Sequence, residues 1–277
     1  MKKIEQQTIA SYAYLWNKEI KQERHIHKTH FEVVQSMLDS PIVQKGIGME
    51  IGCGPGRDME FMARAYSENK FIAVDFNFSI LEVAKKLRPL KNVFFVRASA
   101  LALPFKNGKV DFVYSFGVLH HTVDPAKGIS EIDRILKDKG TATLYLYENH
   151  EDNRIKFYSL KAVTLLRRLT IQLPPRVLYS FCAVLSPFIY LLFSVPAGLL
   201  GKLGKAKGLA DKIPFNFGKH PFDLVGDLFD RFGTPIEVRY GREELDGTMR
   251  REKFSNVILK KIPDTAGWVV YAAKNSK

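Results

Sequence analysis

Short apolar runs rich in β-branched and aromatic residues alternate with longer amphipathic stretches through the first half of the chain. Five runs read as strands, at residues 46–51, 70–75, 92–97, 110–116 and 141–148. The stretches between them, at 57–67, 79–88 and 125–138, have the apolar spacing of helices. Ser79 is a candidate N-cap, and Pro125 suits a first helical turn. Strands that alternate with helices predict βαβ units and a parallel sheet.

The pattern changes beyond residue 150. A mainly helical segment follows the fifth strand, and after it residues 242–252 read as a helix and residues 254–262 and 267–274 as a pair of strands joined by the turn PDTAG. We therefore predict an α/β fold with a doubly wound, Rossmann-like sheet and a helical cap inserted after strand five. The predicted regions are a helical lid at 1–45, a core at 46–150, a cap at 151–232 and a closing helix and hairpin at 233–277.

The insertion is basic and apolar at once. The net charge of the chain is +13, and residues 154–220 carry eleven Lys or Arg against one acid, Asp211. Residues 177–200 contain no charge and are bracketed by Arg176 and Lys202. This run is long enough to span a bilayer, but two prolines interrupt it, and positive charge on both sides gives no orientation signal.

The insertion is better explained by a pair of helices, broken near residues 174–175 and near Pro187, with basic residues on the outer face. Such helices would form an apolar pocket for a small molecule or rest on an anionic membrane surface.

Cysteine and histidine usage argues against a disulfide framework or a metal site. Cys53 and Cys182 are too few and too far apart for either. His25, His27 and His30 have no Cys or acid partner at ligand spacing, so we expect them on a solvated helix face. The N-terminal sequence has no apolar segment of the kind found in secretory signals, so we expect a cytoplasmic location. Peripheral contact with a membrane surface is compatible with that location.

A glycine-rich turn follows the first predicted strand. Residues 50–57 read EIGCGPGR, a GxGxG pattern where strand gives way to helix. Glycine there lets the backbone turn tightly and approach a ligand, because it has no Cβ and tolerates positive φ. Asp75 ends the second strand, where a carboxylate can accept both hydroxyls of a ribose.

Dinucleotide-binding sites use the longer pattern GxGxxG, whereas here the third glycine comes one residue early and Glu50 stands two residues before Gly52. This combination resembles the first motif of class I S-adenosylmethionine-dependent methyltransferases. The resemblance continues through FIAVDFNFSILEVAKK at 71–86 and through residues 96–148. It implies a seven-stranded sheet of order 3-2-1-4-5-7-6 with the seventh strand antiparallel, and S-adenosylmethionine as cofactor with S-adenosylhomocysteine as product.

The resemblance also implies a set of cofactor contacts. Glu50 would support the amino group of the cofactor, Asp75 its ribose, and Phe76 its adenine face. Ser99 stands where the family pattern has an Asp that accepts from the adenine amino group. The full set of predicted cofactor residues is Glu50, Gly52, Cys53, Gly54, Gly56, Asp75, Phe76, Ser99, Ala100 and Phe116.

Candidate catalytic residues follow strands four and five. His120 and His121 lie after strand four, where open α/β folds bind ligands, and a histidine can take a proton from an acceptor near neutral pH. The alternative is that one His binds the cofactor or caps a loop while the other packs in the core. Glu148, just past strand five, is a rival base.

Four further residues are candidates for contact with the acceptor: Tyr14, Trp16, Arg239 and Tyr240. Tyr12, Tyr14 and Trp16 could fold over the cofactor, or they could be core aromatics. Arg239 could hold an acidic group of the acceptor, or it could form a structural ion pair.

The sequence therefore predicts an enzyme that methylates a small, partly apolar acceptor. One alternative is a nucleic-acid or protein methyltransferase that uses the basic insertion. The insertion is loaded with Leu, Val and Phe, however, and the (Asn/Asp)-Pro-Pro-(Tyr/Phe) motif of amino-group DNA methylases is absent, so we expect no nucleic-acid partner. Another alternative is a noncatalytic nucleotide-binding module. Neither the acceptor nor the oligomeric state follows from the sequence.

Overall fold

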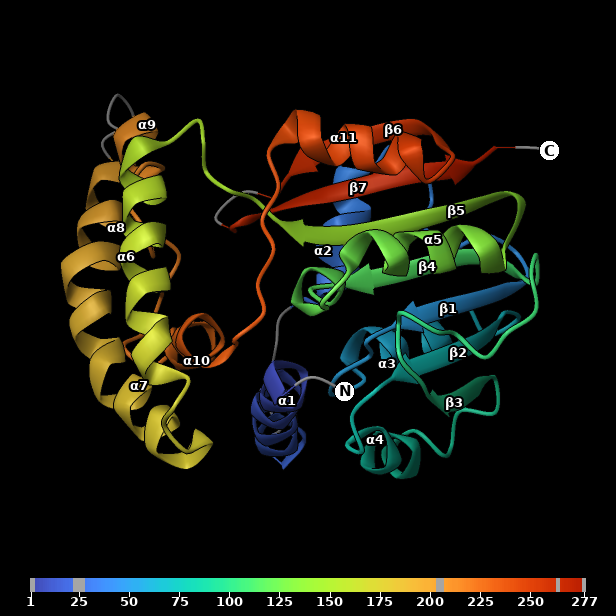
Figure 1. The fold of residues 1–277 in the computed structure, drawn as a ribbon, viewed down its shortest axis with the longest axis horizontal. Helices are drawn as coiled ribbons and strands as arrows, with labels where there is room; N and C mark the ends of the chain where they lie inside the picture. Colours follow the sequence, from blue (N-terminus) through green and yellow to red (C-terminus); the bar gives the residue numbers. More distant parts are fainter. Residues whose placement is uncertain (1–2, 22–27, 203–206, 263–264, 276–277) are drawn as a thin grey trace. The chain divides into compact units, whose positions relative to one another are not determined.

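The structure, a computed structural model, describes residues 3–21, 28–202, 207–262 and 265–275, and the chain forms two compact units (Figure 1). The sheet unit consists of Trp16–Glu148, Glu237–Ile262 and Gly267–Lys277, and the helical unit of Met1–Leu15, Asn149–Ile236 and Pro263–Ala266. Residues 1–45, predicted as one lid, are thus divided, because helix α1 (Lys3–Lys21) contributes to both units.

The sheet has the order β3-β2-β1-β4-β5-β7-β6, which confirms the predicted doubly wound topology. Strands β1 to β5 pair in parallel, and β7 is antiparallel to both β5 and β6. The strands are β1 (Ile47–Ile51), β2 (Lys70–Asp75), β3 (Val93–Arg97), β4 (Val110–Phe116), β5 (Leu136–Tyr147), β6 (Phe254–Lys261) and β7 (Gly267–Lys274). The carboxyl ends of the parallel strands therefore meet at one edge, where such folds bind ligands.

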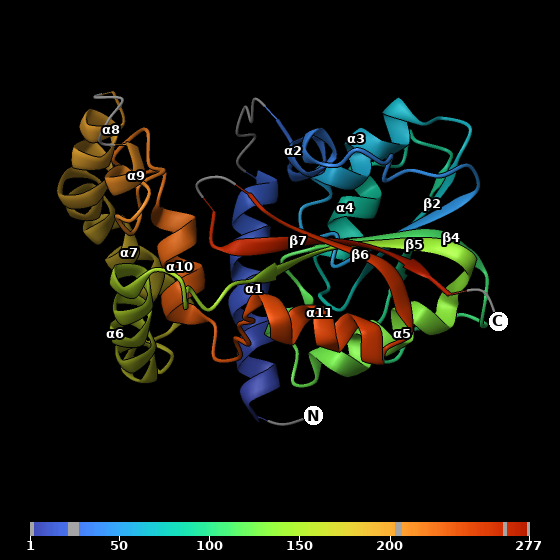
Figure 2. The same cartoon turned by 90° about the horizontal axis from the view of Figure 1, so that it is seen from above.

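Helices cover both faces of this sheet (Figure 2). On one face lie α2 (His30–Met37), α3 (Arg57–Ala65) and α4 (Ile80–Lys86), and on the other lie α5 (Pro125–Ile135) and α11 (Arg242–Arg251). Each face has its own apolar cluster, one including Met59 and Val83 and the other Ile132 and Leu245. Burial on both faces explains why the strands read as nearly continuous apolar runs.

The helix starts show which capping predictions hold. Asp124 accepts a hydrogen bond from the Lys127 amide at 2.9 Å, and Pro125 occupies the first turn of α5 as predicted. Ser79 stands at the N-cap position of α4, as predicted, but its side chain makes no capping hydrogen bond. Its backbone is already helical, with φ −55° and ψ −23°, whereas a capping residue needs an extended backbone to reach the following amides.

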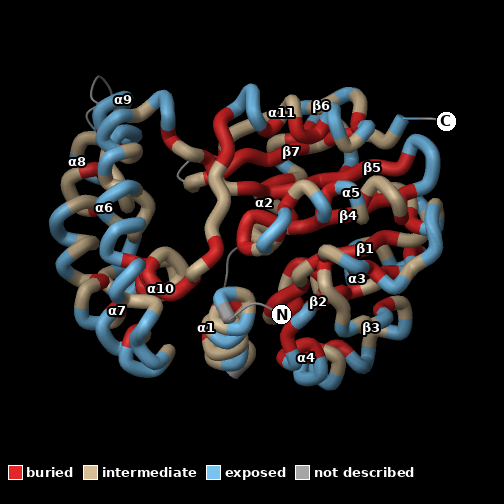
Figure 3. The backbone as a smooth tube through the Cα atoms, in the orientation of Figure 1, coloured by how far each residue is buried: buried red, intermediate tan, exposed pale blue. Residues whose placement is uncertain are grey.

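The helical unit is organised around α10 (Val225–Gly233). Its buried residues are Val225, Leu228, Phe229, Phe232 and Gly233, and both α6 (Arg154–Thr170) and α7 (Pro175–Ile189) pack against it. A π-helical turn η2 (Tyr190–Ser194), α8 (Val195–Lys202) and the short α9 (Lys207–Ala210) complete the unit. Figure 3 shows α10 as mainly buried, whereas α6, α7 and α8 are largely exposed or half-buried.

The predicted break near Pro174 is confirmed, since α7 begins at Pro175, but the predicted break at Pro187 is wrong. Pro187 lies inside α7, and the helical backbone continues through η2 into α8 as far as Lys202. A proline removes only one donor, and the Ser186 hydroxyl next to it donates to the Pro221 carbonyl at 2.6 Å, which fixes this part of the helix. Pro196 also lies inside this continuous helix, two residues after η2, and an irregular turn of this kind is typical next to a proline in a helix.

Candidate cofactor and active site

The turn between β1 and α3 requires its glycines. Gly52, Gly54 and Gly56 all have positive φ, at 76°, 49° and 78°. A Cβ on Gly52 would lie 2.1 Å from Cγ2 of Val118, and one on Gly56 would lie 2.3 Å from Cγ1 of Val83. Positive φ and close neighbours together exclude any larger residue at these two positions.

Glu50 lies in β1, directly beside this turn, and is buried with 4% exposure. Its Oε2 atom has no hydrogen-bond partner in the described part of the chain. Burial, followed by the nearby carboxyls of Asp58 and Asp75, raises the pKa of Glu50 well above its usual value. A buried carboxyl without a partner is costly, so it fits a ligand that brings a positive charge or hydrogen-bond donors.

Asp75 is fixed by the backbone around it. Its Oδ2 accepts a hydrogen bond from the Gly54 amide at 2.9 Å, and its Oδ1 accepts one from the Asn77 amide at 2.8 Å. Burial raises the pKa of Asp75, and these hydrogen bonds oppose that rise. Each carboxylate oxygen has a second lone pair, so the side chain can still accept two hydroxyl groups.

Aromatic and cationic side chains follow β2 and β3. Phe76 is 36% exposed, and the Arg97 guanidinium lies 5.4 Å from its ring centroid and 3.6 Å from that of Phe78. The Ser99 hydroxyl oxygen accepts a hydrogen bond from the Leu101 amide at 3.1 Å. Ser99 therefore stabilises its own turn, and Phe76 is the predicted adenine contact with an accessible face.

A stack of rings stands at the carboxyl end of β4. Phe116 lies 4.2 Å from the His30 ring and 4.2 Å from the Tyr145 ring, almost parallel to both. A Cβ on the next residue, Gly117, would meet nothing within 4 Å, so open space adjoins this strand end. Sequence reasoning missed the stack, because nothing in the local pattern near His30 indicates a partner in β4.

Trp16 lies over the glycine turn. A Cβ on Gly54 would be 3.3 Å from Cε2 of its indole ring. Tyr14, by contrast, belongs to the helical unit, where its ring lies 5.9 Å from Tyr179 and 5.8 Å from Phe229. Of these two predicted acceptor contacts, Trp16 is therefore the one that the structure places beside the candidate cofactor residues.

The two histidines occupy a 3-10 turn, η1 (Leu119–His121), just past β4. The His120 ring is fully buried and stacks on Tyr147 at 3.9 Å. Neither ring nitrogen of His120 has a hydrogen-bond partner in the described residues. Burial, followed by the charges of His121 and Arg239, lowers its pKa well below the usual value, so His120 is neutral at neutral pH.

Glu148 and Arg239 are both engaged within the sheet unit. Lys261 Nζ lies 2.6 Å from Glu148 Oε2. Arg239 Nε lies 2.6 Å from Glu237 Oε1 in a buried ion pair, and its Nη1 donates to the Glu148 carbonyl at 3.0 Å. The candidate base Glu148 therefore has a cationic partner. Of the two roles predicted for Arg239, contact with an acidic group of the acceptor or a structural ion pair, the structure shows the ion pair.

Tyr240 lies in the apolar core with 5% exposure, and burial, followed by the charges of Glu244 and Asp124, raises its pKa to about 12. Its carbonyl accepts a hydrogen bond from the Trp268 indole at 3.2 Å. Tyr240 thus packs the returning chain against the sheet, and nothing in its surroundings points to an acceptor.

From the sequence, His25, His27 and His30 are expected on a solvated helix face and not at a metal site. His25 and His27 lie outside the described residues. His30 stacks on Phe116, and its Nδ1 lies 3.7 Å from Asp58 Oδ2. The described residues contain no group of three or more His, Cys, Asp or Glu side chains that could hold a metal ion.

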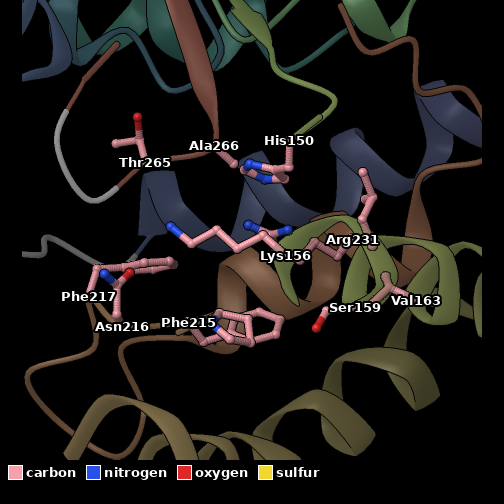
Figure 4. Close-up of a pocket in the computed structure, with 12 residues that line it drawn as sticks. His150, Lys156, Ser159, Val163, Phe215, Asn216, Phe217, Arg231, Thr265 and Ala266 are labelled. Carbon is pink, nitrogen blue, oxygen red and sulfur yellow. The ribbon is translucent and has the colours of Figure 1, made fainter. Parts of the chain in front are cut away.

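The helical unit has a pocket of its own (Figure 4). Basic, aromatic and polar side chains line it: His150, Lys156, Arg231, Phe215, Phe217, Ser159, Asn216 and Thr265, with Leu160, Val163, Pro214 and Ala266. The Arg231 guanidinium lies 5.0 Å from the Phe215 ring centroid and pairs with Asp227 at 2.8 Å. Sequence reasoning did not find this pocket, because its walls come from segments far apart in the chain.

Residues 49–144 match the family described as methyltransferase domain. The chain carries a class I S-adenosylmethionine-dependent methyltransferase domain. The match lies within the sheet unit and includes the glycine turn, Asp75 and both histidines.

Curated relatives agree on the domain and differ in the names of their acceptors. The demethylmenaquinone methyltransferase of Lactococcus lactis is 33% identical over 96 residues, which is 33% of this chain and 38% of the relative. The malonyl-[acyl-carrier protein] O-methyltransferase of Legionella pneumophila is 27% identical over 93 residues, 33% of each. The chain spans between 31% and 59% of the length of the first curated relatives.

A solved structure supports the fold over nearly the whole chain. A SAM-dependent methyltransferase of Aquifex aeolicus aligns with a TM-score of 0.53 at 13% identity, covering 95% of this chain and 97% of the other. The glycine turn and the unpartnered Glu50 carboxyl fit the cofactor of this family. The carboxyl of Glu50 would suit its ammonium group, and that of Asp75 would suit its ribose hydroxyls.

Proposed function

We propose that the whole protein transfers the methyl group of S-adenosylmethionine to a small-molecule acceptor with a substantial apolar part. The observation that carries the proposal is Glu50: a methyltransferase domain keeps a buried carboxyl whose Oε2 has no hydrogen-bond partner among the described residues, beside a glycine turn that also holds Asp75. This arrangement costs stability in the free protein and is compensated when a ligand with a positive amino group binds.

When bound, S-adenosylmethionine supplies a methyl group on a positively charged sulfur. The protein's residues would position it: Glu50 at the amino group, Asp75 at the ribose, and Phe76 on the adenine face. Methyl transfer needs an in-line approach of the acceptor, so holding both partners in one geometry is the main catalytic contribution. Gly117, which has open space beside it, comes two residues before the turn η1 that holds both histidines.

His120 and His121 remain the candidates for the general base, should the acceptor need to lose a proton. A base must be unprotonated to act, and the lowered pKa of His120 keeps it so at neutral pH, but the burial that lowers this pKa also makes the ring a weaker base. Glu148 is less suited, because its Oε2 already lies 2.6 Å from Lys261 Nζ in an ion pair.

The proposed acceptor class rests on the helical unit, whose exposed surface is apolar and basic. A nucleic-acid acceptor is disfavoured, because exposed Leu, Val and Phe side chains separate the positive charges.

The assignment is tested by titration calorimetry with S-adenosylmethionine and with NAD. We expect the wild-type protein to bind the former in preference. Asp75→Ala should weaken that binding by about 1.5–3 kcal/mol, the range for hydrogen bonds to charged groups. Since Asp75 also accepts two backbone amides, Asp75→Asn serves as a control that keeps the shape of the side chain. Equal affinity in the Ala variant, or a preference for NAD, would contradict the proposal.

The base is tested by turnover once an acceptor has been found by screening. Replacing the essential histidine, in His120→Ala or His121→Ala, should lower kcat by about 10²- to 10⁴-fold while cofactor affinity stays nearly unchanged. Normal turnover in both variants and in Glu148→Ala would show that no general base operates.

A further inference from the structure

The outer side of α7, η2 and α8 carries a stripe of exposed apolar side chains. In α8, Leu199 is 59% exposed. In α7 and η2, six of these side chains are between 47% and 68% exposed: Val177, Phe181, Val184, Phe188, Leu191 and Leu192. They recur every three or four residues, so they lie along one side of the helix. Leu178, Cys182 and Ser186 occupy another side and are buried. The helix is therefore apolar on the side that packs and also on the side that faces outward.

Burial within the protein does not account for this composition. Among the described residues, Pro175–Lys202 is the one helix long and apolar enough to cross a membrane, with 28 residues, and 17% of its most apolar window is buried. A core helix of a soluble protein would be mostly buried. Exposed apolar surface of this extent marks an interaction site.

Helix α6 also has an exposed apolar stripe, and a row of basic residues runs beside it. Its exposed side carries the apolar residues Ile155, Tyr158, Leu165, Leu166 and Leu169, between 51% and 68% exposed. Arg154, Lys161 and Arg168 are also exposed and recur every seven residues, so they form a row along one edge of that apolar stripe. An apolar stripe bordered by Lys and Arg is typical of helices that lie in a membrane interface.

We propose that this lipid-binding face, formed by the exposed sides of α6, α7, η2 and α8, binds the surface of an anionic lipid bilayer. Charge complementarity favours this partner. Residues 154–202 contain no acid, Arg154, Lys161, Arg168, Arg176 and Lys202 are exposed, and the row on α6 borders apolar side chains that can enter the acyl boundary. Both α6 and α7 pack on α10 and leave these sides exposed (Figure 3). The proposal concerns location and does not depend on the methyl acceptor.

The same contacts indicate that the helices lie on the bilayer and do not cross it. The Ser186 hydroxyl donates to the Pro221 carbonyl, and the Ser194 hydroxyl donates to the Phe215 carbonyl. These contacts tie Pro175–Lys202 to the backbone of residues 215 and 221, and its α7 part also packs on α10. A bilayer crossing would break them and move the helix away from its partner.

The test is co-sedimentation of the whole protein with vesicles of phosphatidylcholine, alone or with about one third phosphatidylglycerol, over a salt series. We expect at least tenfold tighter binding to the anionic vesicles, weakening as salt rises. Each basic residue that reaches the surface is worth about fivefold in affinity, so Arg154→Gln/Lys161→Gln/Arg168→Gln should bind at least tenfold more weakly. Val184→Glu/Leu192→Glu should abolish binding.

Matched controls come from the sheet unit. Lys70→Gln/Lys106→Gln/Lys109→Gln makes the same change in charge at exposed sites, and Leu81→Glu/Phe94→Glu places acids at residues that are 54% and 51% exposed. Both should bind vesicles like the wild type. Circular dichroism checks that every variant folds.

Three results would overturn the proposal. Equal binding to neutral and anionic vesicles would remove the role of charge. Binding that only detergent reverses would establish a bilayer crossing. Absence of binding, together with a dimer that Val184→Glu/Leu192→Glu dissociates, would assign the face to a second copy of the chain. Because vesicle binding is measured without cofactor, its failure is distinct from a failure of the proposed methyl transfer.

Discussion

The buried carboxyl of Glu50 lowers the stability of the cofactor-free protein, and the same carboxyl favours binding of the cofactor. Its carboxyl is buried, its Oε2 has no hydrogen-bond partner in the described chain, and burial raises its pKa well above the usual value. The cofactor-free protein therefore favours the protonated form. An ammonium ligand favours the charged form, so cofactor binding should lower this pKa again.

This reasoning predicts the behaviour of Glu50→Gln. A carboxyl whose pKa is raised on folding contributes stability below its unfolded pKa of about 4.3, and that contribution is lost as pH rises through the folded pKa. At neutral pH the Gln variant, which has no charge to bury, should be more stable than the wild type by about 1–3 kcal/mol. Thermal unfolding between acid and neutral pH measures the difference, which should disappear toward pH 4.

The same variant should bind S-adenosylmethionine at least tenfold more weakly, because a neutral amide attracts an ammonium group less than a carboxylate does. Calorimetry of both proteins provides this second measurement. A variant that is less stable at neutral pH, or one that binds as tightly as the wild type, would show that Glu50 is a structural residue.

The residues that could be predicted from sequence are those whose roles depend on local spacing. Glu50, Gly52 and Asp75 lie within 26 positions of one another, and strand, turn and helix bring them together in any protein with this pattern. Two predicted site residues have partners from distant segments of the chain, and these partners change the roles expected for them. Lys261 pairs with Glu148, and His30 stacks on Phe116. Only tertiary packing creates such pairs, so no periodicity in the sequence indicates them.

Among the elements, strands were predicted more closely than helix ends. The ranges 70–75, 110–116 and 267–274 match β2, β4 and β7 residue for residue, since apolar runs in a buried sheet end where burial ends. Strand β5 begins at Leu136, five residues before its predicted start. Its pairing with β4 is irregular between Val110 and Phe112, so polar residues 137–139 sit in the strand without an alternating pattern.

The helices of the helical unit show the limit of apolar periodicity. Leu178 and Val184 are both apolar, yet the first is buried against the unit and the second is 68% exposed. A helix with apolar residues on two sides gives no sequence signal for which side is the core. The outward apolar stripe of α7 and α8 could therefore be recognised only from the structure.

At the scale of the whole molecule, each unit has its own apolar core. The sheet unit has clusters on both faces of the sheet, and the helical unit is built around α10. Units with separate cores often unfold in separate steps. The cofactor residues Glu50, Gly52 and Asp75 all belong to the sheet unit, so cofactor binding should stabilise the two units unequally.

Tryptophan fluorescence can test this, because both tryptophans of the chain, Trp16 and Trp268, belong to the sheet unit. S-adenosylhomocysteine at about a hundred times its Kd should stabilise that unit by about 2.7 kcal/mol and raise the fluorescence midpoint by about 5–10 °C. Far-UV circular dichroism, which also follows α6, α7, α8 and α10, should keep a second transition that the ligand does not move. A single transition that shifts equally in both signals would mean that the two units unfold together.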